Sequence, residues 1–168
     1  MLDAAEDFTA EMSLADAQLP ECSPIADVPP AGSIRFEAED TSEPFLGGTQ
    51  PVERKGASRD WILSGWNQPG FYAKWTFTVP ASGKYRVRVL AAHVLPQTRE
   101  FLLDGKPMGG DSGFCVWTPT GGFGYTPAEW RWFEMPWTVE LAQGRHTLTI
   151  VQMKNSGNLD EIAVVPVQ

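Results

Sequence analysis

The sequence predicts an all-β protein: an antiparallel β-sandwich of the jelly-roll type, preceded by an irregular N-terminal arm. After residue 33, apolar residues alternate in short runs that end at turn residues, and no helical periodicity of any length follows. Glycine and proline are frequent, with 16 and 14 copies, as expected of a fold with many turns. The 168 residues, of which 42% are hydrophobic and 20% charged, suffice for one domain with a buried core plus a tail.

The first 32 residues differ in composition from the rest of the chain. They are acidic and rich in alanine and serine. Their second half contains Pro20, Pro24, Pro29 and Pro30. This composition predicts a linker or loosely packed arm over residues 1–32 and a sandwich domain over residues 33–168. A short amphipathic helix around residues 4–17 is an alternative within the arm, although its apolar face is thin.

Strand signals follow one another along the rest of the chain. Residues 85–91 alternate most clearly, with Val87 and Val89 on the inner face and Arg86 and Arg88 on the outer face. An Asp-Gly pair after residue 103 is a hairpin-type turn signal. The other segments predicted as strands are 75–79, 100–103, 138–141, 146–151 and 162–165.

The charge balance excludes two classes of partner. With 13 Lys and Arg against 21 Asp and Glu, the formal net charge is -8, whereas nucleic acids and anionic membranes are bound by clustered basic residues. No apolar run approaches the length of a membrane span. Residues 1–30 lack the basic start and apolar stretch of a signal peptide. If the protein is secreted, we expect that its signal peptide has been removed from this sequence, or that this domain comes from the interior of a longer chain.

The two cysteines, Cys22 and Cys115, leave two alternatives open. A disulfide between them would staple the arm to a loop of the domain and would require an oxidising compartment. Two free thiols are the other alternative, and the spacing favours neither.

Glu37 and Glu39 form the most informative polar pattern. In a strand, residues two apart point to the same face, so these carboxylates would lie side by side while Phe36 and Ala38 face the other way. If the first and last strands of the domain pair or cross, Asp160 joins them. Three carboxylates among backbone carbonyls form the hard-oxygen environment that Ca2+ prefers. A solvated acidic face is the alternative interpretation.

The segment from 109 to 136 combines aromatic side chains with glycine and proline. Its aromatic residues have no periodicity that would place them in a core, so we expect some of them to be exposed on a loop. They are Trp117, Phe123, Tyr125, Trp130, Trp132 and Phe133.

Several stretches, taken in order over about residues 34–166, resemble carbohydrate-binding modules of the family 6 and family 35 type. Those modules are calcium-bearing β-sandwiches appended to secreted enzymes that act on polysaccharides. The matching stretches are Phe36-Glu37-Ala38-Glu39-Asp40, residues 65–75 (GWNQPGFYAKW), residues 77–87 (FTVPASGKYRV), Leu103-Asp104-Gly105, residues 139–148 (VELAQGRHTL) and Asn158-Leu159-Asp160-Glu161-Ile162. Each stretch is weak alone, and the ordered set carries the resemblance.

The resemblance implies a structural Ca2+ held by Glu37, Glu39 and Asp160, with backbone carbonyls completing its shell. The two closely spaced glutamates are therefore better used as metal ligands than as a catalytic acid pair. We assign three other tryptophans to the core or scaffold: Trp61, Trp75 and Trp137.

The resemblance also implies a sugar cleft among the loops at one end of the sandwich, formed by two aromatic rings and an asparagine. The first ring corresponds to Trp66, the second to Trp130 or its neighbour Trp132, and the asparagine to Asn158. A pyranose packs its C–H patches on an aromatic face, and its hydroxyls pair with an amide that donates and accepts. Strand alternation favours a core position for Trp132, and a turn-capping role is the alternative for Asn158. We expect Trp66→Ala or Trp130→Ala to abolish binding and leave folding intact.

The predicted function is non-catalytic polysaccharide binding by a secreted monomer that holds a catalytic domain of the same parent chain at its substrate. The two histidines, His93 and His146, have neither zinc-site nor triad spacing, and the sequence contains no nucleotide-binding loop, so we predict no enzyme activity. The alternative is a β-sandwich without its own sugar site that packs its aromatic residues against a neighbouring domain.

Overall fold

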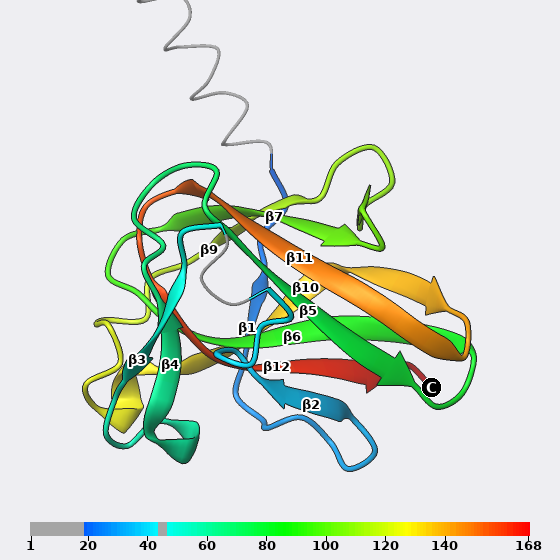
Figure 1. The fold of residues 1–168 in the computed structure, drawn as a ribbon, viewed down its shortest axis with the longest axis horizontal. Helices are drawn as coiled ribbons and strands as arrows, with labels where there is room; N and C mark the ends of the chain where they lie inside the picture. The colour runs from blue at the N-terminus through cyan, green and yellow to red at the C-terminus, as the bar shows by residue number, and fades with distance from the viewer. Residues whose placement is uncertain (1–18, 44–46) are drawn as a thin grey trace, which may run out of the picture.

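The computed structural model describes residues 19–43 and 47–168, which form two antiparallel β-sheets packed face to face (Figure 1). The seven-stranded sheet has the order β1-β10-β6-β12-β4-β3, with β2 also paired to β12. The five-stranded sheet has the order β5-β11-β7-β8, with β9 also paired to β7. The predicted all-β sandwich is confirmed.

The strands of the seven-stranded sheet are β1 (Ser23–Ile25), β2 (Ile34–Glu37), β3 (Gln50–Glu53), β4 (Trp61–Ser64), β6 (Gly83–Ala92), β10 (Arg131–Leu141) and β12 (Asn158–Pro166). Those of the five-stranded sheet are β5 (Tyr72–Val79), β7 (Gln97–Leu103), β8 (Lys106–Pro107), β9 (Phe114–Trp117) and β11 (Gly144–Lys154). Two 3-10 turns, η1 (Ser58–Asp60) and η2 (Pro127–Glu129), complete the elements. In the two described stretches of chain, no helix has the length and apolar character needed to cross a membrane.

The core lies between the sheets and follows from strand alternation. Tyr85, Val87 and Val89 of β6 are buried, while the residues between them are half-buried on the outer face. Trp75 of β5 is fully buried, as predicted, and its indole N–H donates a hydrogen bond to the carbonyl of Ala38 at 2.8 Å. This bond ties the segment after β2 to the opposite sheet.

The sequence pattern did not reveal β1, β3, β4 and β9. Each has only three or four residues, which is too short for alternation to be distinguished from chance. Two of them also contain a proline, Pro24 in β1 and Pro51 in β3, and proline is confined to sheet edges because it has no N–H to donate. Both strands lie at the ends of the seven-stranded sheet.

Residues 22–25 of the N-terminal segment are attached to the sandwich. Strand β1 pairs with β10, and Cys22, just before β1, is fully buried and forms a disulfide with Cys115 of β9. The disulfide therefore fastens the start of the described chain to both sheets. Residues 1–18, which include the alternative helix around 4–17, lie outside the described residues.

One end of the sandwich gathers the loops that follow β4, β6, β9 and β11. The backbone N–H of Thr120, after β9, donates to the carbonyl of His93, after β6, at 3.0 Å. Near the end of β11, the Gln152 amide donates to the carbonyl of Trp66 at 3.1 Å, which fixes the loop after β4. These bonds join the loops at this end of the sandwich to one another.

Candidate functional site

Three acidic side chains meet at the end of β2, where this strand pairs with β12. β2 ends at Glu37, which lies opposite Glu161 of β12, and the backbone N–H of Ala38 donates to the carbonyl of Asp160 at 2.9 Å. Glu37, Glu39 and Asp160 each place one carboxylate oxygen within 4.8 Å of the others. The prediction that the first and last strands bring these three residues together is therefore confirmed.

The electrostatics of this acidic cluster favour a cation. Each carboxylate has one buried oxygen without a hydrogen-bond partner among the described residues: Glu37 Oε2, Glu39 Oε2 and Asp160 Oδ1. Burial, followed by the charges of neighbouring carboxylates, raises the pKa of Glu39 to about 7, and burial likewise raises the pKa of Asp160 to about 7. Packing carboxylates together out of water is costly unless a positive charge offsets them.

The turn η1 holds the outer side of the acidic cluster. The backbone N–H of Ser58 donates to Asp160 Oδ2 at 3.0 Å, and the Ser58 hydroxyl donates to Glu37 Oε1 at 2.7 Å. Arg59 Nε lies 3.4 Å from the same Glu37 oxygen, and Arg59 Nη2 lies 2.6 Å from Asp40 Oδ2. Sequence reasoning missed Ser58, because a serine in a short turn far from the acidic residues carries no metal-site signal.

The acidic cluster suits a hard divalent cation such as Ca2+. Two oxygen ligands of one Ca2+, each at about 2.3–2.6 Å, lie no more than about 5 Å apart, and the three carboxylates meet this limit. One oxygen of each carboxylate is free to bind an ion, while Ser58 orients the other oxygen of two of them.

Trp66 is not an open stacking platform, which corrects the prediction made from the sequence. Its side chain is fully buried, and its indole N–H donates to the carbonyl of Leu63 at 3.2 Å. The guanidinium of Arg99, also fully buried, stacks on the ring at 4.1 Å from its centroid. The predicted cleft between Trp66, Trp130 and Asn158 is therefore not formed with Trp66 as a wall.

Asn158 and Trp130 both anchor the loop between β9 and β10. Asn158 is 6% exposed, and its amide donates to the carbonyl of Phe123 at 2.9 Å. The half-buried Trp130 donates from its indole N–H to the carbonyl of Gly124 at 3.1 Å. Only glycine fits at 124, because a Cβ there would lie 2.3 Å from the Trp130 ring. The amide of Asn158 thus positions the loop.

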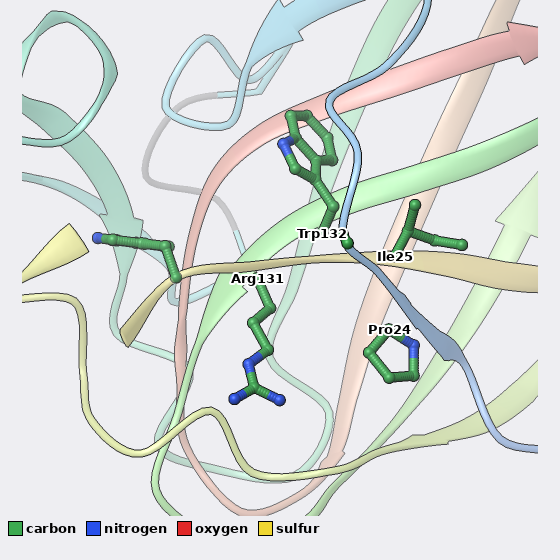
Figure 2. A pocket seen from close by; sticks show the side chains of 6 residues that line it. Pro24, Ile25, Arg131 and Trp132 are labelled. Atoms are coloured by element: carbon green, nitrogen blue, oxygen red, sulfur yellow. The ribbon is translucent and has the colours of Figure 1, made fainter. Parts of the chain in front are cut away.

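Trp130 and Trp132 line one pocket of about 350 Å3 beside the paired strands β1 and β10. Pro24 and Ile25 of β1 form its other wall, and Arg131 points away from Trp132 (Figure 2). Trp132 itself is only 7% exposed, but it belongs to a small apolar cluster with Ala163 and Val165 that is separate from the main core, which contains the neighbouring Phe133.

The exposed aromatic surface lies on the loop between β9 and β10. Tyr125 is 71% exposed and Phe123 is 37% exposed, whereas Trp117 and Phe133 of the same predicted aromatic segment are fully buried. The Arg54 guanidinium covers one face of Tyr125, 3.8 Å from the ring centroid, and donates to the carbonyl of Phe123 at 3.1 Å. The sequence indicated exposed aromatic residues in this segment, but it did not identify Tyr125 or its partner.

Comparisons with known proteins find the fold but no close relative. No protein-family model and no curated protein matches the chain. A family 35 carbohydrate-binding module from Clostridium thermocellum matches with a TM-score of 0.67 and 18% identity, over 82% of this chain and 100% of that chain.

Two larger enzymes contain the same fold. The GH26-CBM35 β-(1,4)-mannanase of Podospora anserina matches with a TM-score of 0.66 and 17% identity, over 83% of this chain. The exo-β-1,3-galactanase of Phanerochaete chrysosporium matches with a TM-score of 0.61 and 19% identity, over 80% of this chain. The chain spans only 28% of the mannanase and 29% of the galactanase. At these identities the likeness establishes the fold, which is that of the family 35 carbohydrate-binding modules.

Proposed function

We propose that this protein is a non-catalytic carbohydrate-binding module that binds polysaccharide through the loop between β9 and β10 and carries a structural Ca2+ in the acidic cluster. The observation that carries the sugar-binding half is the Tyr125 ring, 71% exposed and backed on one face by Arg54. Its outer face is a flat apolar surface of the kind on which the C–H patches of a pyranose pack.

The loop that carries Tyr125 is preorganised for binding. Asn158 and Arg54 both donate to the carbonyl of Phe123, and the Thr126 hydroxyl donates to Glu129 Oε2 at 2.6 Å. A ligand that meets a preformed surface does not have to order it, so a larger part of the contact energy appears as affinity. Trp130 stays a candidate contact, because it is half-buried beside this loop.

The acidic cluster supports the Ca2+ half of the proposal. Glu37, Glu39 and Asp160 join the end of β2 to β12, so an ion there would tie the two ends of the domain together. When bound, Ca2+ would offset the repulsion between the buried carboxylates and stabilise the folded state.

The larger enzymes with this fold support an ancillary role in a longer secreted protein. We propose that the module acts as a monomer, attached to a catalytic domain, and raises the effective concentration of that domain at its polysaccharide. The Cys22–Cys115 disulfide supports an oxidising, extracellular compartment.

Affinity electrophoresis in gels containing β-mannan, β-1,3-galactan or dextran tests the sugar-binding half. We expect one of these polymers to retard the protein, Tyr125→Ala to abolish the retardation and Tyr125→Phe to preserve it, because the ring rather than the hydroxyl makes the contact. Equal retardation of Tyr125→Ala and the parent protein would exclude this surface. No retardation by any polymer would favour the second candidate function, in which the sandwich packs against a neighbouring domain. The exposed Val94 and Leu95, on the loop after β6, are apolar residues suited to such packing.

A further inference from the structure

Trp61 lies at the surface, although the sequence assigned it to the core or scaffold. Its side chain is 44% exposed, and no residue in the described part of the chain accepts a hydrogen bond from its indole N–H. It is the first residue of β4 and directly follows η1, the turn that holds the acidic cluster. A large apolar ring is therefore presented to solvent beside the proposed ion site.

A pocket of about 470 Å3 opens beside this ring. It is lined by Glu39, Asp40, Pro51, Arg59 and Trp61, and we call it the Trp61 pocket. Its volume falls within the range of about 300–1,000 Å3 that is common for small-molecule sites. The walls combine a flat apolar ring with a carboxylate that accepts hydrogen bonds and a guanidinium that donates them.

We propose that the Trp61 pocket is a second carbohydrate subsite and that its affinity depends on the ion in the acidic cluster. A sugar ring would pack on the face of Trp61 while its hydroxyls donate to Asp40 and accept from Arg59. The Arg59–Asp40 pair, joined at 2.6 Å, is well exposed on both sides, with 59% and 60% of the side chains accessible. Its polar atoms are thus available to a ligand.

Two contacts couple the pocket to the acidic cluster. Glu39 belongs to both, and Ser58 fastens η1, which carries Arg59, to Glu37 and Asp160. An ion that fixes the three carboxylates also fixes the wall of the pocket, whereas carboxylates that repel each other loosen it. The coupling is reciprocal, so a sugar in the pocket also strengthens ion binding.

The loop between the paired strands β3 and β4 joins the Trp61 pocket to the Tyr125 surface. Arg54, which stacks on Tyr125, donates its backbone N–H to the carbonyl of Asp60 at 2.8 Å, and Asp60 precedes Trp61. One polysaccharide chain that contacts both surfaces would bind more tightly than either surface alone allows. The second subsite rests on the proposed function, but it is located by a different set of residues.

NMR of the Trp61 indole N–H tests the proposal, with the signal assigned through Trp61→Phe. We use galactose, mannose and glucose as probes, each titrated to high millimolar concentration in CaCl2 and again in chelator. We expect at least one sugar to give a saturable shift in CaCl2, with affinity weakened about tenfold or more in chelator. Arg59→Ala should weaken the interaction, and Ser58→Ala should reduce the effect of Ca2+.

The Tyr125→Ala variant distinguishes the second subsite at Trp61 from the proposed polysaccharide binding at the Tyr125 surface. It should abolish retardation by polysaccharide at the loop surface and leave the Trp61 titration unchanged. The absence of a saturable Trp61 shift with all three sugars in CaCl2 would overturn the second subsite, even if Tyr125-dependent binding and Ca2+ stabilisation are both observed. A saturable shift with equal affinity in CaCl2 and chelator would overturn the coupling.

Discussion

The guanidinium carbon of Arg99 lies 4.1 Å from the centroid of the Trp66 ring, and both side chains are fully buried. Trp117 lies on the guanidinium as well, at 5.2 Å, and Gln97 Oε1 accepts bonds from Nε and Nη2. None of the carboxylates that the structure describes pairs with Arg99. Burial lowers the pKa of Arg99 to about 9, so it stays charged at neutral pH, and the two indole faces stabilise the charge by cation–π attraction.

This stacking predicts that Trp66→Ala destabilises the fold, contrary to the expectation from the sequence that folding stays intact. Removal of the ring leaves a cavity and withdraws one face from a buried charge, so we expect a loss of about 3–5 kcal/mol in the free energy of unfolding. Urea unfolding followed by circular dichroism measures it. Tyr125→Ala, at an exposed ring, is the matched control and should stay within about 0.5 kcal/mol of the parent. A Trp66→Ala protein as stable as this control would contradict the stacking role.

Ca2+ should raise the melting temperature of the parent protein and have no effect on Asp160→Asn. At a concentration 100 times the Kd, a ligand specific for the folded state adds about 2.7 kcal/mol of stability. Glu140→Gln removes an exposed carboxylate on β10 and should respond to Ca2+ as the parent does. Melting curves in CaCl2 and in chelator provide the measurement. A Ca2+ response that survives Asp160→Asn would place the ion elsewhere.

The raised pKa values of Glu39 and Asp160 predict that, without Ca2+, the folded state becomes less stable as the pH rises. In the folded state both are raised to about 7 from ordinary values of 4.5 and 3.8, so between these limits the folded protein binds more protons than the unfolded chain. Stability in chelator should therefore fall as the pH rises from 5 to 8. Ca2+ should remove this fall, because the ion replaces the protons. Unfolding curves at the two pH values, with and without Ca2+, test the sign, and a rise in chelator would refute it.

Reduction of the Cys22–Cys115 disulfide should release β1 from β10. The bridge closes a long loop, with a sequence separation of 93, and the loss of such a bond costs about 2–5 kcal/mol. Ile25 of β1 packs against Trp132, so reduction should also bring this ring into water and shift its fluorescence to longer wavelength. Trp132→Phe should lack that part of the shift. An unchanged melting temperature in reductant would show that the strand pairing alone holds β1.

The acidic cluster shows what local pattern can predict in this protein. Glu37 and Glu39 are separated by one residue, and the pairing of the first and last strands is a common feature of sandwiches, so their meeting with Asp160 followed from strand geometry. The longer strands, such as β6 and β11, also have enough alternating residues to be recognised. Ser58 was not predictable, because its approach to the acidic cluster depends on how the loop before β4 folds back.

Tertiary structure decides which of the tryptophan and tyrosine side chains are buried and which are exposed. The sequence by itself determined the sandwich, its main strands and the three carboxylates, because strand periodicity is a local property of the chain. It did not determine that Trp66 is buried while Trp61 and Tyr125 are exposed. An aromatic residue in a loop has no periodicity to assign its face, and its exposure is set by partners distant in sequence: Arg99 encloses Trp66, and Arg54 supports Tyr125 from one side. Only the packed loops bring those partners into place.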